Sequence, residues 1–501
     1  MIRARSKSIL PSVAIPPGED AVLDRLFAGQ RQSQPAASGV RLIAEGTDAF
    51  ALRVLSARAA QRTLDLQYYI WHSDPTGQYL AHEVLLAADR GVRVRMLLDD
   101  MDARSRDGLL MAIDQHPQIE IRLFNPFATR SGMLRTLREL FRRGSRLNHR
   151  MHNKAWIADG RLAIVGGRNV GDEYFSASAG VNFVDLDATL AGAVVEKTER
   201  IFDQYWNSDG AVPIARLRRT ARNRLTLDEV RRQLTEGVRT QVDDLYARRL
   251  RESPQIQDLL AGRCQLTWAN EVEVVADDPR KALKSPREID PGVLESIEAG
   301  FAATERELLV ISPYFVPGPG GTAALRRLAL NGRHVAVLTN SLAATDVAAV
   351  HSGYSRYREP LLEAGVKLHE LKPGPDESED EHNPRMRLGS SKASLHTKAA
   401  VVDREHIFVG SFNLDPRSAT LNCEMGVWIR DHSLGQELAT LFELGASPQR
   451  SFTVTLDERS ELAWTEQLNG RAVRYDHDPY AGWGRRCVTW LLRYLPIESL
   501  L

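Results

Sequence analysis

A single short pattern occurs twice in this 501-residue chain, beginning at residue 152 and again at residue 396. Each copy holds a histidine, a lysine two positions later, an aspartate, a pair of small residues and an asparagine, in the same spacing. The copies are His152, Lys154, Asp159, Gly166, Gly167 and Asn169, and His396, Lys398, Asp403, Gly410, Ser411 and Asn413. Two matched sets predict two related halves that assemble one site. A site rich in histidine and lysine, with no pair of carboxylates between them, suits a phosphodiester.

Each copy also predicts its own local structure. Apolar runs at 154–158 and 162–165 flank a short turn that begins with Asp159, and the second copy repeats this arrangement. Such runs on either side of a turn are typical of a β-hairpin. Because side chains at i and i+2 share one face of a strand, His152 and Lys154 should project together, as should His396 and Lys398.

The duplicated pattern resembles the HKD signature of the phospholipase D superfamily. From about Asp65 onward the chain is similar to the bacterial cardiolipin synthase C type within that superfamily. The stretches that carry this closer resemblance are Leu66–Trp71, Arg122–Phe127, Thr339–Ala344, Ser411–Ser418 and Leu495–Pro496. Gly167 stands where the superfamily usually has serine, but it fits this subfamily. Its first half therefore lacks one hydroxyl group, so that half is expected to bind phosphate slightly differently.

The resemblance implies an α/β fold with two pseudo-symmetric phospholipase-D-like domains, each a mixed β-sheet flanked by helices, that share one active-site cleft. An internal repeat supports this, because 64–71 parallels 308–315 and 91–99 parallels 332–340, with a helical stretch between each pair. Strand, helix, strand and hairpin form an α/β half with a mostly buried sheet. We expect a flexible extension at 1–40, halves at 41–212 and 263–445, an Arg-rich helical linker at 213–262, and a C-terminal extension with an amphipathic basic tail at 446–501.

The resemblance also assigns catalytic roles. One histidine attacks phosphorus and forms a phosphohistidine, while the other acts as general acid and then as general base. We assign attack to His152 and proton transfer to His396. The motif residues Lys154, Asp159, Lys398 and Asp403 complete the catalytic set, although both aspartates sit at hairpin turns and are expected to be structural. Phosphate binding is assigned to Asn169, Asn413, Gly166 and Ser411, with the lysines and asparagines stabilising charge on the phosphate oxygens.

Two further carboxylates are expected to orient the imidazoles. Glu424 follows His396 by 28 residues and resembles the family's orienting carboxylate, and Asp185 takes the matching place after His152. Orienting a histidine from behind is a recognised role for a carboxylate. The alternative is an ordinary salt bridge in the core or at the surface. We predict no metal and no cofactor, because two ammonium groups supply the positive charge.

Composition narrows the substrate class and the location. Lys plus Arg equals Asp plus Glu at 65 each, whereas nucleic-acid enzymes more often carry a basic excess. The three cysteines lie far apart without metal spacing, which fits a reducing compartment. No apolar run reaches the roughly 18 to 20 residues that span a bilayer. A lipid enzyme of this kind would therefore lie on the membrane surface.

Two basic amphipathic segments bear on membrane contact. Residues 130–150 contain seven arginines and one acid, with apolar residues on one helical face. The C-terminal tail has an apolar stripe, Val488, Leu491, Leu492 and Leu495, with arginines elsewhere and two tryptophans nearby. Such segments are typical of helices on anionic lipid. Packing against the protein is the alternative for both.

We therefore predict a phosphatidyltransferase that makes cardiolipin by moving a phosphatidyl group onto phosphatidylglycerol. The donor is phosphatidylglycerol or phosphatidylethanolamine. Alternatives are a phospholipase-D-type lipid hydrolase, a nuclease of the same superfamily and a non-catalytic lipid-binding relic. The expected partners are phospholipid substrates and an anionic membrane surface, with no nucleic acid. The expected location is the cytoplasmic side of a bacterial inner membrane, as a peripheral protein.

Overall fold

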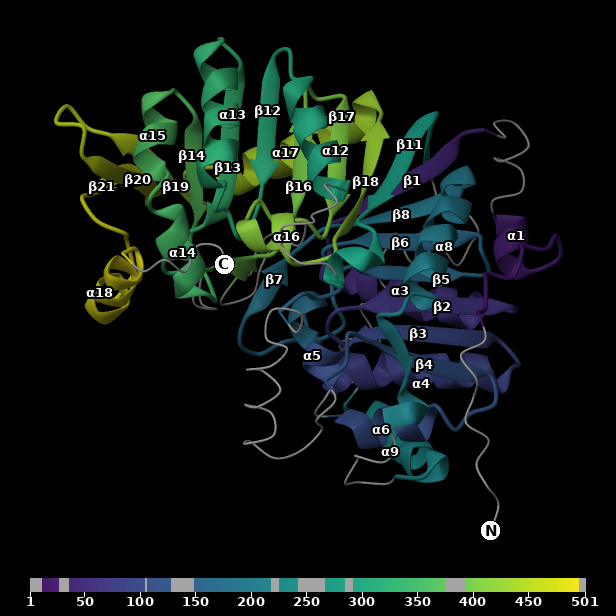
Figure 1. Ribbon diagram of the computed structural model, residues 1–501. Helices are drawn as coiled ribbons and strands as arrows, with labels where there is room; N and C mark the ends of the chain where they lie inside the picture. Colours follow the sequence, from purple (N-terminus) through teal and green to yellow (C-terminus); the bar gives the residue numbers. More distant parts are fainter. Residues whose placement is uncertain are drawn as a thin grey trace.

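The protein folds into two α/β halves that lie against each other (Figure 1). The computed structural model describes residues 11–26, 36–103, 106–127, 148–217, 225–241, 266–283, 292–374 and 393–494. The first half is built on one mixed sheet and the second half on another, which confirms the predicted fold class. The predicted basic helix within 130–150 and the acidic run at 376–381 lie almost wholly outside the described residues.

The first sheet has nine strands among the described residues, and its centre is parallel. In spatial order these are β10 (Thr267–Ala269), β1 (Ser38–Ile43), β8 (Asp187–Gly192), β6 (Leu162–Gly166), β5 (Ala155–Ala158), β2 (Thr63–Tyr68), β3 (Arg93–Asp99), β4 (Ile119–Phe124) and β9 (Ala211–Pro213). Strands β2, β3 and β4 run parallel, and the motif hairpin β5–β6 joins β2 antiparallel. This order places the start of β5 beside the end of β2.

The second sheet repeats this order and extends it. Its strands are β11 (Glu271–Ala276), β18 (Met425–Arg430), β17 (His406–Gly410), β16 (Ala399–Val402), β12 (Glu307–Ile311), β13 (His334–Asn340), β14 (Lys367–Leu371), β19 (Ser451–Leu456), β20 (Leu462–Leu468) and β21 (Arg471–Tyr475). Strands β12, β13 and β14 run parallel, and the hairpin β16–β17 joins β12 antiparallel. Each half therefore places its motif hairpin in the same position relative to a parallel core.

Helices cover the sheets and also fill the space between them. In the first half they are α1 (Val22–Leu26), α3 (Gly46–Ala59), α4 (Pro75–Asp89), α5 (Asp100–Ala103), α6 (Asp107–Ile113), α8 (Ala193–Trp206) and α9 (Leu227–Gln241). In the second half they are α12 (Gly292–Ala302), α13 (Gly318–Leu330), α14 (Ala348–Tyr354), α15 (Arg358–Glu363), α16 (Pro416–Thr420), α17 (His432–Ala446) and α18 (Trp483–Leu492). Short 3-10 turns occur at Asp172–Tyr174, Ile214–Leu217 and Pro279–Ala282.

One of the hydrophobic cores is shared by the two halves. Apolar side chains of both motif hairpins, including Val165 and Val409, pack there with residues of α8 and α17. The outer face of each sheet has its own core, covered by α3 and α4 in the first half and by α12 and α13 in the second. Strands buried on both faces are continuously apolar, as in β5 and β16. The shared core fixes the two hairpins side by side.

A small third sheet links the halves. Strand β15 (Ala393–Leu395), which leads into the second motif, pairs parallel with β7 (Asn182–Val184) of the first half. An isolated bridge between Met151 and Cys423 does the same for the first motif. Each motif segment is therefore aligned by backbone hydrogen bonds from the opposite half.

Several expected boundaries differ from the structure. Strand β10, placed by the expected boundary at 263 in the second half, pairs with β1 at the edge of the first sheet. Residues 451–475, expected to be part of an extension, form β19, β20 and β21, which continue the second sheet beyond β14. The reason is physical, because an unpaired edge strand is covered by a further strand wherever the chain supplies one.

The predicted extension and linker also contact the first half where they are described. Arg62 and Arg161 both form ion pairs with Asp24 in α1, so the segment 11–26 is tied to the first half. Helix α9, within the predicted linker, packs against α4 and α6. Leu234 of α9 is buried in the first-half core.

Candidate active site

The two motif histidines lie just before their hairpin strands and are held by the opposite half. The backbone N–H of His152 donates to the Cys423 carbonyl at 2.8 Å. The backbone N–H of His396 donates to the Val184 carbonyl, also at 2.8 Å. These paired bonds make the position of each imidazole depend on the contact between the halves.

Each imidazole also contacts a buried carboxylate of the opposite half. Nδ1 of His152 lies 2.8 Å from Oε2 of Glu424, and Nδ1 of His396 lies 2.5 Å from Oδ2 of Asp185. The spacing along the chain identifies Glu424 and Asp185 as candidates. It does not indicate that each carboxylate contacts the histidine of the opposite half. Because Nδ1 of each ring faces a carboxylate, Nε2 is the nitrogen that remains for a substrate.

The two motif lysines are almost completely buried beside the histidines. Nζ of Lys154 donates to the carbonyl of His152, and Nζ of Lys398 donates to the carbonyl of His396. The same i to i+2 contact therefore occurs in both halves, as the strand pattern predicts. Both lysines are 1% exposed, so water screens their charges little.

Burial lowers the pKa of both motif histidines and both motif lysines. Burial, reinforced by the Lys154 charge, lowers the pKa of His152 to about 4 against the opposing effect of Glu424. Burial and the Lys398 charge likewise lower the pKa of His396. Burial lowers the pKa of Lys398 to about 8 and moves that of Lys154 in the same direction. At neutral pH His152 is therefore an unprotonated base.

Electrostatic contacts across the halves show that the motifs form one cluster. The Lys398 charge contributes to the lowered pKa of His152, and the Lys154 charge contributes to that of His396. Burial would raise the pKa of Glu424, but His152 and then Lys154 outweigh it and the pKa is lowered. Asp185 responds in the same way to His396 and Lys398. Two imidazoles, two ammonium groups and two carboxylates are thus brought together.

The motif aspartates lie outside this cluster, at the far ends of β5 and β16. Asp159 accepts hydrogen bonds from the backbone N–H groups of residues 61, 62 and 63, where β2 begins. Asp403 accepts from those of residues 305, 306 and 307, where β12 begins. Both aspartates adopt positive φ, as a tight hairpin turn requires. Each one secures the hairpin to the neighbouring parallel strand.

The small residues of the two motifs leave room for neighbouring carboxylates or bind them. A Cβ on Gly167 would lie 2.2 Å from Oδ1 of Asp185, so only glycine fits there. At the matching place in the second half, the Ser411 hydroxyl donates to Glu424. A Cβ on Gly166 would meet Oδ1 of Asp187 at 2.3 Å. The shorter Asp185 is thus paired with glycine, and the longer Glu424 with serine.

The motif asparagines differ from each other. Oδ1 of Asn169 accepts from the backbone N–H of Ile70 at 3.2 Å, and Nδ2 donates to the Tyr174 hydroxyl at 2.9 Å. Asn169 therefore already has protein partners at both ends of its amide. Asn413 is buried, and its Oδ1 has no hydrogen-bond partner among the residues that the structure describes. Since buried polar groups are normally paired, Asn413 is the asparagine with unused capacity for a ligand.

Aromatic rings that sequence reasoning did not assign surround the histidines. The ring of Tyr69 packs edge-on against His152 at 5.1 Å between centroids, and the Lys154 ammonium lies over it at 5.6 Å. Tyr174 and Phe183 pack against His396 at 5.3 and 5.0 Å. These rings exclude water and limit rotation of the imidazoles. Tyr69 lies in the 64–71 repeat, whose strand end was a signal that could have identified it.

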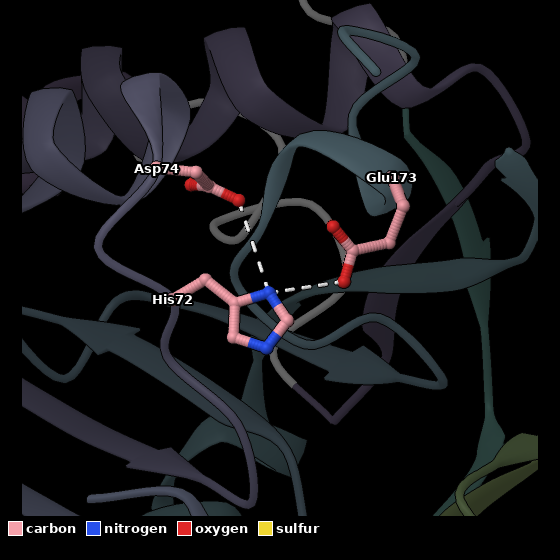
Figure 2. Close-up of side chains that lie close together, drawn as sticks. All are labelled: His72, Asp74 and Glu173. Carbon is pink, nitrogen blue, oxygen red and sulfur yellow. Dashed lines mark ion pairs between the residues drawn. The ribbon is translucent and has the colours of Figure 1, made fainter. Parts of the chain in front are cut away.

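A polar cluster beside the site has the composition of a possible metal site. Figure 2 shows Nδ1 of His72 facing Glu173 at 3.1 Å and Asp74 at 3.8 Å. Both Asp74 oxygens already accept backbone N–H groups, from Gly77 and Asp172. The hydrogen bond to Glu173 outweighs burial and raises the pKa of His72. Glu173 thus favours the protonated form of this imidazole over the neutral form that a metal ion would need.

A second group of potential ligands is already filled by an arginine. His351, Glu370 and Asp478 lie close enough to share an ion. The Arg358 guanidinium lies among them, 2.9 Å from Glu370 and 2.7 Å from Asp478. The Arg358 guanidinium therefore takes the place that a metal ion would have among these three residues.

Comparison with known proteins agrees with this geometry. The family model described as cardiolipin synthase, phospholipase-D-like domain, matches residues 56–206 and 298–444. The chain belongs to the phospholipase D superfamily. Each matched region contains one motif hairpin and one motif histidine. The predicted resemblance to the phospholipase D superfamily and to the cardiolipin synthase C type is confirmed, as is the prediction that the chain is an enzyme.

Relatives narrow the type of phospholipase D enzyme. The chain is 38% identical over 474 residues to cardiolipin synthase C of Escherichia coli K12, covering 93% of this chain and 97% of that protein. It is 26% identical over 438 residues to cardiolipin synthase A of Pseudomonas fluorescens Pf-5, covering 87% and 74%. The chain is thus a cardiolipin synthase-like phosphatidyltransferase of the phospholipase D superfamily.

A solved structure supports the fold alone. The crystal structure of phosphatidylserine synthase from Haemophilus influenzae Rd KW20 matches with a TM-score of 0.58 and 14% sequence identity. The match covers 94% of this chain and 99% of that one. Separately, no helix within the described ranges is both long and apolar enough to cross a bilayer.

Proposed function

We propose that this phospholipase D enzyme makes cardiolipin by moving a phosphatidyl group from a donor phospholipid to the hydroxyl group of phosphatidylglycerol. The observation that carries the proposal is the crossed pair, His152 with Glu424 and His396 with Asp185, flanked by two buried lysines. Phosphatidylglycerol and phosphatidylethanolamine are both candidate donors. Similarity to cardiolipin synthases C and A supports the choice of product.

In the first step, Nε2 of His152 attacks the phosphorus of the donor. A P–N bond forms, the P–O bond to the donor's headgroup breaks, and its electron pair goes to the headgroup oxygen. His396 in its protonated form gives its Nε2 proton to that oxygen, which leaves as an alcohol. The lowered pKa of His152 makes its free base available at neutral pH. Because the pKa of His396 is lowered too, the choice of His152 as the nucleophile rests on the family resemblance.

In the second step, neutral His396 removes the proton from the hydroxyl of phosphatidylglycerol. The alcohol oxygen attacks phosphorus, the P–N bond breaks, and cardiolipin leaves with His152 restored. Lys154 and Lys398 lie where they can stabilise negative charge on the phosphate oxygens in both steps. Asp185 and Glu424 hold Nδ1 of each ring and stabilise the cationic imidazole when it forms.

The proposed location is the cytoplasmic face of a bacterial inner membrane, with the protein attached peripherally. Two observations support it: the relatives are bacterial lipid synthases, and the described cysteines, Cys423 and Cys487, are free thiols. Reduced cysteines are typical of the cytoplasm.

The deciding experiment gives purified protein phosphatidylglycerol, with and without phosphatidylethanolamine, and identifies products by mass spectrometry. Cardiolipin is expected, and isotopic labels on each lipid identify the donor. Phosphatidic acid alone would replace the proposal with a hydrolase. Cleavage of single-stranded DNA that His152→Ala abolishes would replace it with a nuclease. Acid-labile labelling of wild type but not His152→Ala, with labelled lipid, is expected for the phosphohistidine.

A further inference from the structure

Helix α18 is amphipathic, but it exposes its apolar face, whereas an ordinary surface helix buries that face. Its large apolar side chains face solvent, and its polar side chains face the protein. The exposed residues are Trp483, Val488, Trp490, Leu491 and the adjacent Tyr494, with exposed fractions from 50% to 76%. Thr489, on the other side, is buried. Packing of the apolar stripe into the core, one of the two explanations for this tail, therefore does not apply to Val488 and Leu491.

Polar contacts attach α18 firmly to the second half. Arg485 donates to the carbonyl of Thr345, and Arg356 donates to the carbonyl of Arg493. Just before the helix, Asp478 accepts from Arg358 of α15 at 2.7 Å and lies 3.3 Å from His351 of α14. Figure 1 shows α18 beside α14 at the outer edge of this half. The exposed apolar face therefore has a fixed orientation.

This attachment ties α18 to a segment of the second half that also influences the catalytic cluster. Thr345, which holds Arg485, precedes Asp346. Asp346 accepts the Tyr314 hydroxyl at 2.8 Å, and its charge is among those that act on Lys398. A surface that covers the apolar face of α18 would thus contact the half of the protein that carries the second motif.

The charge and composition of α18 identify the surface. Between residues 483 and 494 there are three arginines and no acidic residue. Tryptophan and tyrosine beside arginine are typical of segments at the boundary between lipid headgroups and acyl chains. Exposed apolar patches of this kind mark interaction sites. A protein partner would explain the apolar side chains but not the uniformly positive charge in an enzyme for lipid phosphates.

We propose that α18 is a lipid-docking helix, which inserts its exposed aromatic and aliphatic side chains into an anionic bilayer. The arginines, half-buried on the side that faces the protein, give the helix a positive charge that attracts the anionic headgroups. The inference rests on the proposed function for the statement that the substrates lie in that bilayer. The inference identifies the surface of the enzyme that contacts the bilayer and therefore its orientation on the membrane.

The test compares full-length wild type with the variant W483S/W490S/L491S. Binding is measured by sedimentation with vesicles of phosphatidylcholine and phosphatidylglycerol in equal amounts, and with vesicles of phosphatidylcholine alone. We expect the variant to bind the mixed vesicles at least about tenfold more weakly, since each side chain contributes burial in lipid. A matched control, L330S/L468S, removes exposed apolar side chains elsewhere and should bind like wild type.

Further measurements separate docking from folding and from chemistry. Turnover of a water-soluble short-chain phosphatidylglycerol should be the same in the variant and wild type, whereas turnover of vesicle lipid should fall. Arg486→Gln should weaken vesicle binding at low salt and have less effect at high salt.

Unchanged vesicle binding by the triple variant would overturn the docking helix, as would a wild-type dimer that the variant converts to monomer. Failure of the proposed function is a different result, in which wild type binds vesicles but forms no cardiolipin.

Discussion

Glu424 of the second half holds Nδ1 of His152 of the first half at 2.8 Å, so neither half of this enzyme contains a complete catalytic unit. The same holds for Asp185 and His396 in the opposite direction. The Glu424 carboxylate is itself fixed by the Ser411 and Ser418 hydroxyls. A change at this contact should therefore affect the chemistry of one histidine through a residue distant in sequence.

Glu424→Gln should lower turnover by roughly 10²- to 10⁴-fold, because the amide holds Nδ1 without stabilising the cationic ring. The change is nearly isosteric, so the melting temperature should fall little. Steady-state kinetics on phosphatidylglycerol measure the effect, with Glu196→Gln, an exposed carboxylate on α8, as the control. Near-normal turnover in Glu424→Gln would show that this carboxylate does not support His152.

Gly167→Ser should reduce activity more than tenfold, because the new Cβ would lie 2.2 Å from Asp185 Oδ1 and would displace the partner of His396. Ser411→Ala removes a single hydrogen bond to Glu424 and should cost less. Gly320→Ser, where a Cβ meets no atom within 4 Å, serves as the control. Equal turnover in Gly167→Ser and wild type would contradict this account of the glycine.

The local parts of the site follow from the sequence because they depend on strand geometry. The i to i+2 spacing agrees with the contacts of Lys154 with His152 and of Lys398 with His396. The turn position agrees with the backbone hydrogen bonds that Asp159 and Asp403 accept, and their structural role stays a prediction. The parallel centre of each sheet also follows, since the repeat of strand, helix and strand is visible in both halves.

The crossed pairing could not be read from the sequence because it depends on how two sheets pack. Spacing along the chain places Glu424 after His396, yet the shared core turns it toward His152. Strand β10 and the strands β19, β20 and β21, which extend the two sheets at their edges, were missed for a similar reason. A strand joins whichever edge lies nearby, and short strands such as Thr267–Ala269 carry little pattern of their own.

Asp159→Ala should destabilise the fold by about 2 kcal/mol, because three backbone N–H groups lose their acceptor and one of them, that of Thr63, is buried. Asp403→Ala should act in the same way on the second half, by less, since its partners are more exposed. Denaturant unfolding measures the change, and turnover of the folded variants at low temperature should remain close to wild type. A variant that keeps its stability but loses turnover would assign this aspartate a chemical role.

Acid should destabilise the protein through His152. Its pKa is about 4 in the folded state, whereas the unfolded side chain titrates near 6.5. Between these values the unfolded chain binds more protons, so this contribution is complete above pH 6.5 and is lost as pH falls toward 4. The loss amounts to roughly 3 kcal/mol. Burial raises the pKa of Asp415 to about 7, which favours folding as pH falls and offsets the His152 effect by an amount of similar size.

The contribution of His152 is therefore measured as a difference. The free energy of unfolding of wild type and of His152→Gln is followed from pH 7 to pH 4, and wild type should lose stability relative to the variant. Asp415→Asn in both backgrounds removes the opposing titration and should steepen the loss in wild type. Parallel curves for wild type and His152→Gln would mean that His152 takes up its proton as readily in the folded protein as in the unfolded chain, and the nucleophile would then be protonated in mildly acidic solution.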